Sequence, residues 1–386
     1  MRSPLLSLLA ALSLAACSES PYITSPRSQA PGTPVFEANG GDGSSGAVFT
    51  ETNAIAGNAV VAFARAGDGS LTYTGTFSTG GTGIGGTNDP LASQYSLVLD
   101  GEDAKFLFVV NAGSNTISTF RVDGASLSLV GTTSSRGTLP VSLAVARHTL
   151  YALNAGSNTV AGFDIGDDGS LTPNADASAP LGAGAAGGAA IRASRDGQVL
   201  VVTEKGSNTI DAYAIGAQGA LGQPVRSTSS GISPFGFDFV IGNQIAISEA
   251  GSAAASLYAV GSNGGLSVES ASVSTNGQAA TCWLIATTNG RFAFTANAGS
   301  GTISGYGIDG QGSMQLLVPS GVSGSTGAGS TPLDLDLSRG DRFLYVLESG
   351  AGRIGAFAVS NSGALTALPG IGGLAAQQGL QGLAAY

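Results

Sequence analysis

A short polar motif recurs seven times along the chain, at intervals of 43 to 58 residues. Its clearest form is Asn-Ala-Gly-Ser-Asn-Thr, which begins at Asn111 and again at Asn154. A repeat of this length indicates one supersecondary unit copied along the chain, because each unit needs its neighbours to bury its apolar face. We call the first residues of the seven copies the turn-motif residues: Asn53, Asn111, Asn154, Glu204, Glu249, Asn297 and Glu348.

Each repeat carries its apolar residues at fixed distances from this motif. An aromatic residue follows nine positions later in six of the seven repeats. In the last repeat, residues 332–337 alternate between apolar and acidic, residues 343–347 are continuously apolar, residues 353–359 form a third run, and a turn at 361–363 leads into a fourth run from 364. Four short strands joined by turns predict a four-stranded antiparallel sheet, and its repetition predicts the blades of a propeller.

The two ends of the repeat region complement each other. Residues 381–386 have the pattern of a first strand, yet no second strand follows them. The first repeat, which starts near Ala47, has second, third and fourth strands but lacks a first. We therefore predict an all-β fold, one seven-bladed β-propeller of four-stranded antiparallel blades over residues 47–386. The C-terminal strand is expected to complete the N-terminal blade, which closes the ring and removes exposed strand edges.

The N-terminus has the pattern of a secretion signal. After the basic Arg2, residues 5–16 are almost entirely apolar and too few to span a bilayer, as in the core of a signal peptide. They end in Leu-Ala-Ala before Cys17, which resembles the bacterial lipobox. We therefore predict a signal peptide over 1–16, lipidation of Cys17, and a flexible Pro/Ser/Gly linker over 17–46. The alternative is an ordinary signal peptide with a chance cysteine. Ser18 at the next position predicts sorting to the outer membrane if the host is Gram-negative.

Charge and composition exclude several classes of function. The chain has 15 Lys+Arg against 25 Asp+Glu, a net charge of −10, so it should repel the phosphate backbone of nucleic acids. His148 is the only histidine, and we expect it in the turn between the first and second strands of its blade. The net charge therefore predicts no nucleic-acid partner. A Ser-His-Asp triad or a zinc site would have to use this one turn histidine, so we predict neither a triad nor a metal centre of the zinc type.

Acidic residues form the densest polar group that the propeller pattern brings together. In a propeller, the turn after the second strand lies at the same end as the start of the inner strand, so the turn-motif residues should surround one mouth of the central channel. Glutamate and aspartate there would form an acidic funnel for a cation such as Ca²⁺, a polyhydroxyl ligand or a basic peptide. The alternative is structural, in which these side chains satisfy the turn N–H groups. We favour it for Asn111, Asn154 and Asn297, and leave it open for the glutamates. The predicted funnel residues are Glu204, Glu249, Glu348, Asp238, Asp334 and Asp336.

Residues 197–215 and the repeated Asn-Ala-Gly-Ser-Asn-Thr resemble the lactonase-like seven-bladed propellers, which include propeller-type 6-phosphogluconolactonase and carboxymuconate cyclase. The resemblance covers about residues 47–386. It implies a glutamate at the end of the second strand of a middle blade, and Glu204 matches that place. The family also has an arginine and histidines near the starts of inner strands, where this chain has Gly-Gly-Ala-Ala-Ile over 187–191 and Leu-Pro-Val-Ser over 139–142.

Two functions therefore remain. The first is a monomeric, non-catalytic propeller, tethered to the cell envelope through Cys17, which binds a small molecule or a protein at the funnel face. It needs no cofactor, although a divalent cation such as calcium would fit the acidic group. The alternative is a lactone hydrolase in which Glu204 is the general base and Arg192 stabilises the oxyanion. Arg195 is the weaker candidate for the second role, because it is expected in a turn at the far face.

Overall fold

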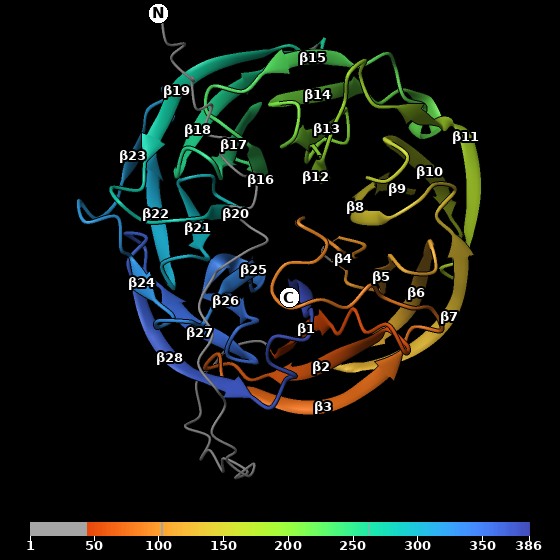
Figure 1. Ribbon diagram of the computed structural model, residues 1–386, viewed down its shortest axis with the longest axis horizontal. Coiled ribbons are helices and arrows are strands. Elements are labelled where there is room, and N and C mark those ends of the chain that lie inside the picture. The colour runs from red at the N-terminus through yellow and green to blue at the C-terminus, as the bar shows by residue number, and fades with distance from the viewer. Residues whose placement is uncertain (1–44, 102, 262) are drawn as a thin grey trace, which may run out of the picture.

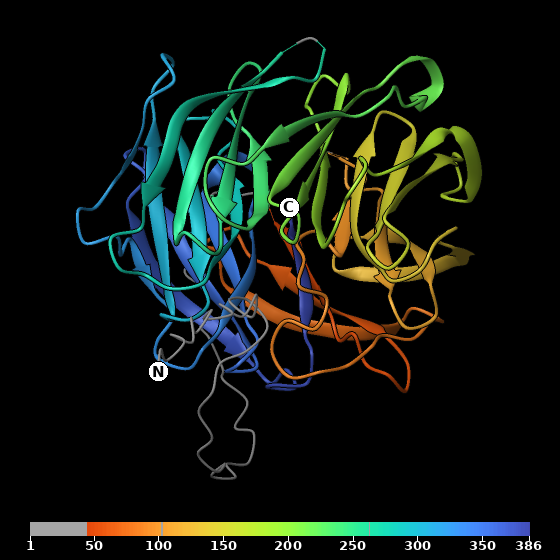
Figure 2. The same ribbon diagram turned by 45° about the horizontal axis from the view of Figure 1, so that its top comes forward.

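The computed structural model of the protein describes residues 45–386, except 102 and 262. The predicted signal peptide, Cys17 and most of the linker lie outside the described residues. Among the described residues, no helix is long and apolar enough to cross a membrane. Figures 1 and 2 show seven sheets arranged as a ring around a central opening, which confirms the predicted fold class.

Each blade is an antiparallel sheet, and its strands are named in order from the innermost to the outermost. One of the blades has a short additional strand, β24 (Gly324–Ser325), which pairs with β22 (Thr302–Ile308). The blades are: blade 1, β29 (Gln381–Ala385), β1 (Gly46–Glu51), β2 (Ala59–Arg65) and β3 (Leu71–Ser78); blade 2, β4 (Leu97–Leu99), β5 (Phe106–Asn111), β6 (Thr116–Asp123) and β7 (Ser126–Ser134); blade 3, β8 (Pro140–Ala146), β9 (Thr149–Asn154), β10 (Thr159–Ile165) and β11 (Leu171–Pro180); blade 4, β12 (Gly188–Ala193), β13 (Val199–Glu204), β14 (Thr209–Ala214) and β15 (Val225–Thr228); blade 5, β16 (Pro234–Phe239), β17 (Gln244–Glu249), β18 (Ala254–Val260) and β19 (Leu266–Ser274); blade 6, β20 (Thr281–Ala286), β21 (Phe292–Asn297), β22 (Thr302–Ile308) and β23 (Met314–Leu316); blade 7, β25 (Pro332–Leu337), β26 (Phe343–Glu348), β27 (Arg353–Val359) and β28 (Leu365–Gly372).

The ring closes through the C-terminal strand, as predicted. β29 pairs antiparallel with β1, with Ala385 opposite Val48 and Ala384 opposite Phe49. The Thr50 hydroxyl also donates a hydrogen bond of 3.0 Å to the Gln381 carbonyl. Residues from the two ends of the propeller region therefore share one sheet.

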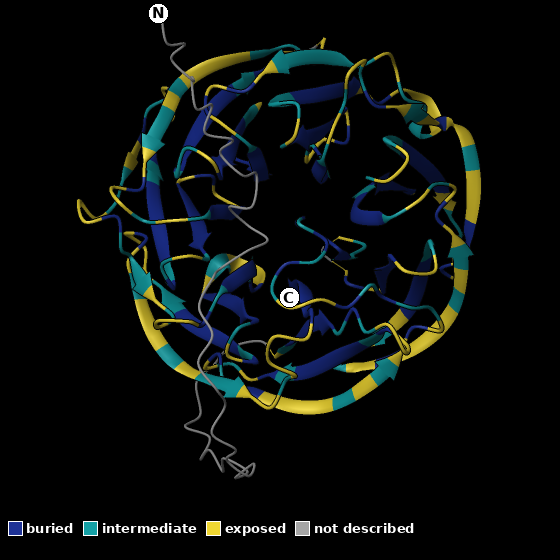
Figure 3. Cartoon of the chain, viewed as in Figure 1, coloured by how far each residue is buried: buried dark blue, intermediate teal, exposed yellow. Residues whose placement is uncertain are grey.

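The burial pattern follows the order of the strands within a blade. The second strands are buried along most of their length, whereas the outermost strands alternate between exposed and partly buried residues (Figure 3). The repeated aromatic residue on the third strand is buried in every described blade, as at Phe163 and Tyr213, which are both 0% exposed. Burial of a side chain of this size contributes about 1.5–3 kcal/mol. The repeat seen in the sequence is thus the repeat of the core between neighbouring blades.

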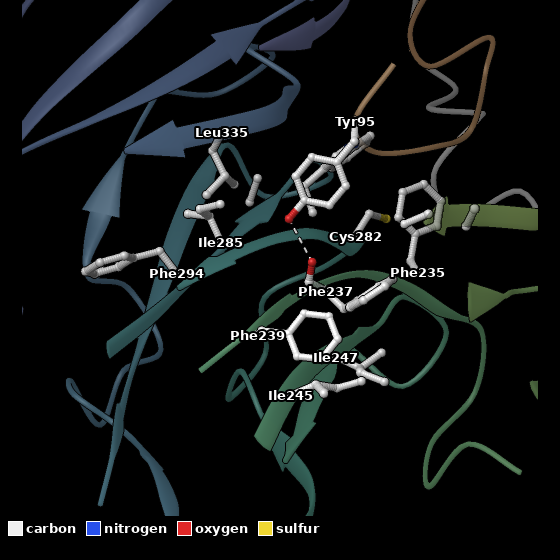
Figure 4. Packing of buried hydrophobic residues seen from close by; sticks show 14 of the residues in the cluster. Tyr95, Phe235, Phe237, Phe239, Ile245, Ile247, Cys282, Ile285, Phe294 and Leu335 are labelled. Carbon is white, nitrogen blue, oxygen red and sulfur yellow. Dashed lines mark hydrogen bonds between the residues drawn. The ribbon is translucent and has the colours of Figure 1, made fainter. Parts of the chain in front are cut away.

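The connection from β3 to β4 enters the ring and fills its centre, which the sequence analysis did not predict. We call residues 92–96 the central plug. Gln94 donates through Nε2 to the Leu284 carbonyl at 2.8 Å, and the Trp283 indole N–H donates to the Ser93 carbonyl at 2.8 Å. The Tyr95 hydroxyl donates to the Phe237 carbonyl at 2.7 Å, the bond drawn in Figure 4.

The central plug is bonded to four inner strands. Besides blades 5 and 6, it reaches blade 3, where Ser93 donates to the Val141 carbonyl at 2.8 Å, and blade 4, where the Gln94 N–H donates to the Ala189 carbonyl at 3.0 Å. Ser93, Gln94 and Tyr95 are at most 5% exposed. The plug therefore lies inside the ring, bonded to the inner strands of blades 3, 4, 5 and 6.

Candidate functional site

The turn-motif residues lie at the mouth where the first strands begin, as predicted, but their side chains are enclosed. Glu204 is opposite Gly188 in the pairing of β12 with β13, and Glu249 is opposite Pro234 in blade 5. All seven turn-motif residues are at most 2% exposed. Asn111 shows the common arrangement, because its Nδ2 donates to Ser118 Oγ at 2.8 Å on the third strand of the same blade. The Asn111 side chain therefore fastens the second strand to the third. In blade 1 the equivalent last residue of the second strand is Glu51, and Asn53 lies two residues beyond it.

Glu204 is held by its own blade. Its Oε2 accepts hydrogen bonds from Arg226 Nη2 at 2.7 Å, Ser207 Oγ at 2.5 Å and Thr209 Oγ1 at 3.2 Å. Loss of hydration raises the pKa of Glu204 to about 7, and the Ser207 hydroxyl and the charge of Arg226 lower it in part. Arg226 lies on the fourth strand, so this glutamate ties three strands of blade 4 together.

Glu249 is held by hydrogen bonds in the same way, whereas Glu348 has an ion pair and its Oε2 accepts no hydrogen bond from the described residues. Glu249 accepts from the Gly231 N–H at 2.8 Å, from the Ser272 hydroxyl at 2.6 Å and from the Ser256 hydroxyl. Glu348 lies 3.6 Å from Arg353 Nε, and loss of hydration raises its pKa to about 7. The structure thus favours the structural interpretation for the three glutamates that the sequence left open.

The three predicted aspartates lie on inner strands, at two different depths of the channel. Asp334 is the third residue of β25 and is 2% exposed, with its Oδ2 free of hydrogen bonds to the described residues. Asp238 and Asp336 are each the fifth residue of a six-residue inner strand, at the end remote from the glutamates. Four residues of a strand span about 13 Å, so the six carboxylates do not form one ring.

Arg192 shares this position, because it is the fifth residue of the six-residue β12. Blades 4, 5 and 7 therefore present Arg192, Asp238 and Asp336 at one level of the channel. This common position within the first strand is a signal that the sequence contains. The sequence-based prediction placed Asp238 and Asp336 beside the glutamates, because it did not count the position of each residue within its inner strand.

The surface is hollowed at this second mouth. Two adjoining hollows of about 400 and 760 Å³ share Val98, Leu99, Gly101, Arg192, Arg195 and Asp238 in their linings. Tyr95 of the central plug lines the larger hollow, together with the apolar side chains of Leu97, Leu337 and Leu383. We call the two together the turn-side hollow, since the turns between first and second strands surround it.

Arg192 and Asp238 form an ion pair in the turn-side hollow. Arg192 Nε lies 2.7 Å from Asp238 Oδ1, and the guanidinium lies 4.6 Å from the centre of the Tyr95 ring. Asp238 also accepts from the N–H groups of Phe239 at 2.8 Å and Ala286 at 3.0 Å. Partial burial would lower the pKa of Arg192, but Asp238, Tyr95 and Asp336 raise it by more, so the guanidinium stays charged.

Asp336 faces the same hollow from blade 7. Its carboxylate accepts one hydrogen bond of 2.9 Å from the Leu337 N–H and one of 2.9 Å from the Ala385 N–H of the closing strand. Loss of hydration raises the pKa of Asp336 to about 7, against the opposing effects of these N–H groups and of Arg192. A carboxyl group with such a pKa exchanges protons readily near neutral pH.

Arg195 reaches across the hollow from the turn after β12. Its guanidinium donates to the carbonyls of Phe239 at 3.1 Å, Thr287 at 3.2 Å and Thr288. His148 is exposed in the turn between β8 and β9, where the sequence predicted it. Within residues 45–386 as described, no three His, Cys, Asp or Glu side chains are arranged to hold a metal ion. The predicted calcium site therefore remains a prediction.

Comparisons with known proteins show what this arrangement is similar to. The structure has a TM-score of 0.69 with a putative 6-phosphogluconolactonase of Bacteroides fragilis, at 16% identity, covering 88% of this chain and 97% of that one. It has a TM-score of 0.67 with the periplasmic gluconolactonase of Pseudomonas aeruginosa, at 18% identity, covering 88% and 99%. A Lactobacillus plantarum protein gives 0.68 at 16% identity, covering 88% and 99%. These identities establish a shared fold only.

Curated proteins compared by sequence give no match. The family model described as lactonase, 7-bladed beta-propeller, matches residues 48–183, 146–276 and 245–379. Those overlapping segments cover the ring from its first blade to its last. The chain therefore belongs to the lactonase seven-bladed β-propeller family.

Proposed function

We propose that this protein is an envelope-anchored binding protein whose turn-side hollow holds a small polyhydroxylated ligand. The observation that carries the proposal is the convergence of Arg192, Asp238 and Asp336 in a concave site with apolar walls. Ligand sites are mostly apolar hollows with a few placed polar groups that fix the orientation of the ligand. The proposal keeps the binding role predicted from the sequence and assigns it to the mouth opposite the turn-motif glutamates, because those glutamates are enclosed.

The chemistry of the lining favours hydroxyl groups. A sugar hydroxyl is both donor and acceptor, so it can donate to the Asp336 carboxylate and accept from the Arg192 guanidinium. The apolar side chains of Leu97 and Leu337 suit the C–H faces of a sugar ring. A gluconolactonase among the structural neighbours supports sugar acids and their lactones as the first compounds to test.

Lactone hydrolysis is the second candidate, favoured by the near-neutral pKa of Asp336. Asp336 would take a proton from water as the water oxygen bonds to the lactone carbonyl carbon. Arg192 would stabilise the oxyanion. The ring C–O bond would then break, and the proton held by Asp336 would pass to the departing ring oxygen to give a hydroxy acid. Glu204, the base predicted from the sequence, also has a pKa of about 7, but it lies opposite Gly188 at the start of β12. Arg192 is four residues further along that strand, a distance of about 13 Å.

The test is a panel of sugar lactones and sugar acids, with binding measured by calorimetry and hydrolysis by pH-stat. We expect Asp336→Asn to weaken binding by about 10-fold or more, because a hydrogen bond to a charged group contributes roughly 1.5–3 kcal/mol. Glu204→Gln and the exposed control Asp176→Asn should bind as the wild type does. Unchanged binding by Asp336→Asn would contradict the proposed site.

The same panel decides the second candidate. If Asp336 is the base, the hydrolysis rate should rise with pH through about 7 and fall to the spontaneous rate in Asp336→Asn. Loss of the rate in Glu204→Gln alone would assign the base to Glu204. Binding by the wild type without hydrolysis above the spontaneous rate would exclude catalysis and leave the binding role.

The envelope location is proposed from the sequence alone. Lipid on Cys17 would anchor the chain, with the linker over 17–46 as the tether. In a Gram-negative host we propose the outer membrane, with the propeller on its periplasmic or outer side. Labelled palmitate should be incorporated into the wild type and not into Cys17→Ala, and equal labelling of both would contradict the anchor.

A further inference from the structure

Arg192 is fixed on one side by groups that are themselves fixed. Its Nε is paired with Asp238 at 2.7 Å, and its Cζ lies over the ring of Tyr95, 4.6 Å from the ring centre. Asp238, whose side chain is only 4% exposed, is held by two backbone N–H groups, and Tyr95 is held by the Phe237 carbonyl. The guanidinium therefore cannot easily turn away from the turn-side hollow.

The outer edge of the same guanidinium is unused. No acceptor among the described residues takes a hydrogen bond from Nη1 or Nη2 of Arg192, and the side chain is 36% exposed at the hollow. A guanidinium has five N–H donors, four of them on these two nitrogens. A preorganised guanidinium edge of this kind matches the two oxygens of a carboxylate in a bidentate pair.

The charged residues around the turn-side hollow are also compatible with a bound anion. Arg195 lines both hollows, and its guanidinium donates to three neutral carbonyls; it has no carboxylate within 4.0 Å among the described residues. The negative charge of Asp238 neutralises the positive charge of Arg192, with which it forms an ion pair. Asp341, at the rim of the larger hollow, already accepts from the Thr288 N–H and hydroxyl at 2.8 and 2.6 Å. Four guanidinium groups thus line the turn-side hollow, those of Arg147, Arg192, Arg195 and Arg339. Each aspartate of its lining accepts at least one hydrogen bond from a protein donor.

We infer that the turn-side hollow recognises a carboxylate carrying neighbouring hydroxyl groups, with the carboxylate paired to Nη1 and Nη2 of Arg192 and a hydroxyl on Asp336. The inference rests on the proposed binding function and specifies its ligand as a hydroxy acid in its anionic form. A planar carboxylate suits the flat guanidinium edge, and phosphate is the competing anion that the test must exclude. Asp238 is a positioning residue in this site, since it orients Arg192 and is saturated by its own partners.

The test compares gluconate with sorbitol, which has a CH₂OH group in place of the carboxylate. Binding to the full chain is measured by calorimetry at constant ionic strength. We expect the wild type to prefer gluconate by about 10-fold or more, because the charge-assisted pair is absent from sorbitol. Arg192→Gln should lose the preference while still binding both compounds weakly. Arg192→Lys should keep only part of it, since an ammonium cannot form the bidentate pair.

Two further variants separate positioning from structure. Asp238→Asn should weaken the binding of gluconate by a larger factor than the binding of sorbitol, whereas a general loss of folding would weaken both equally. Arg136→Gln, at an exposed position before β8, is the matched control and should behave as the wild type. Thermal unfolding of each variant confirms that it is folded.

The outcomes are distinguishable. Failure of the wild type to bind either compound would contradict the proposed function itself. Equal binding of gluconate and sorbitol, or a preference that survives Arg192→Gln, would leave a binding site but overturn the carboxylate. Displacement of gluconate by inorganic phosphate at the same concentration would show a general anion site, and would also overturn it.

Discussion

Deletion of residues 381–386 is expected to lower the melting temperature by more than 10 °C or to give an aggregated protein. The deleted segment contains β29, which is the innermost strand of blade 1 and also contacts blade 7. Its loss exposes the edge of β1 and uncovers Val48 and Phe49, which are both 0% exposed in the closed ring. The deletion also removes Leu383, which is 3% exposed, and loss of a buried leucine side chain costs about 2–5 kcal/mol. Unpaired strand edges also promote association.

Calorimetry and sedimentation velocity measure this effect. The control shortens the other end of the chain, since deletion of residues 18–43 should leave the melting temperature of the propeller unchanged. A C-terminal deletion that melts like the intact chain and stays monomeric would contradict closure of the ring through β29.

Asp334→Asn is expected to stabilise the protein at pH 8 by about 4 °C or more. Burial, together with the charge of Asp89, raises the pKa of Asp334 well above its usual range, and Oδ2 has no hydrogen-bond partner among the described residues. The folded protein must therefore keep a proton on Asp334 at a pH where the unfolded chain has lost it. Each pH unit of that difference costs about 1.4 kcal/mol. An uncharged amide of the same shape removes this cost.

The same reasoning predicts how the stability of the wild type depends on pH. Burial raises the pKa of Glu51 to about 8 and the pKa of Asp89 and Asp336 to about 7. Unfolded carboxyl groups titrate near pH 4, so the folded state binds more protons than the unfolded state between about pH 4 and 8. Stability therefore falls as the pH rises through this window.

Melting temperatures at pH 5 and pH 8 measure both effects. The wild type should melt higher at pH 5, and Asp334→Asn should show a smaller difference between the two values. Asp176→Asn, an exposed control on β11, should follow the wild type. A wild type that melts higher at pH 8 would mean that these buried carboxyl groups are ionised and paired in the folded protein.

Much of the fold could be predicted because the repeat is local. The turn-motif residue and the aromatic residue nine positions later lie on the second and third strands of one hairpin, so their spacing is fixed by that hairpin and survives in the sequence. Ring closure was readable for a similar reason, since a strand pattern without partners at residues 381–386 matches a blade that lacks its first strand.

The local repeat could not predict that residues 92–96 enter the ring, or at which end of the channel the candidate site lies. Gln94 and Tyr95 bond to Leu284 and Phe237, which lie more than 140 residues away, and nothing in the local pattern of a connection between blades marks it as buried. Glu204 looked free in the sequence because its partner, Arg226, is 22 residues further on, beyond a loop of variable length. The sequence therefore predicted correctly at which end of the blade the three glutamates lie, but it did not predict that their side chains are enclosed.

The central claim is that the ligand site lies at the turn-side hollow and not at the mouth beside the turn-motif residues. A crystal structure of the protein with gluconate tests this most directly, because the two candidate sites lie at opposite ends of the inner strands. We predict density for the ligand in the hollow, with its carboxylate about 2.8 Å from Nη1 and Nη2 of Arg192 and a hydroxyl on Asp336. Density instead at the opposite mouth, beside Lys205 and Glu204, would contradict the account.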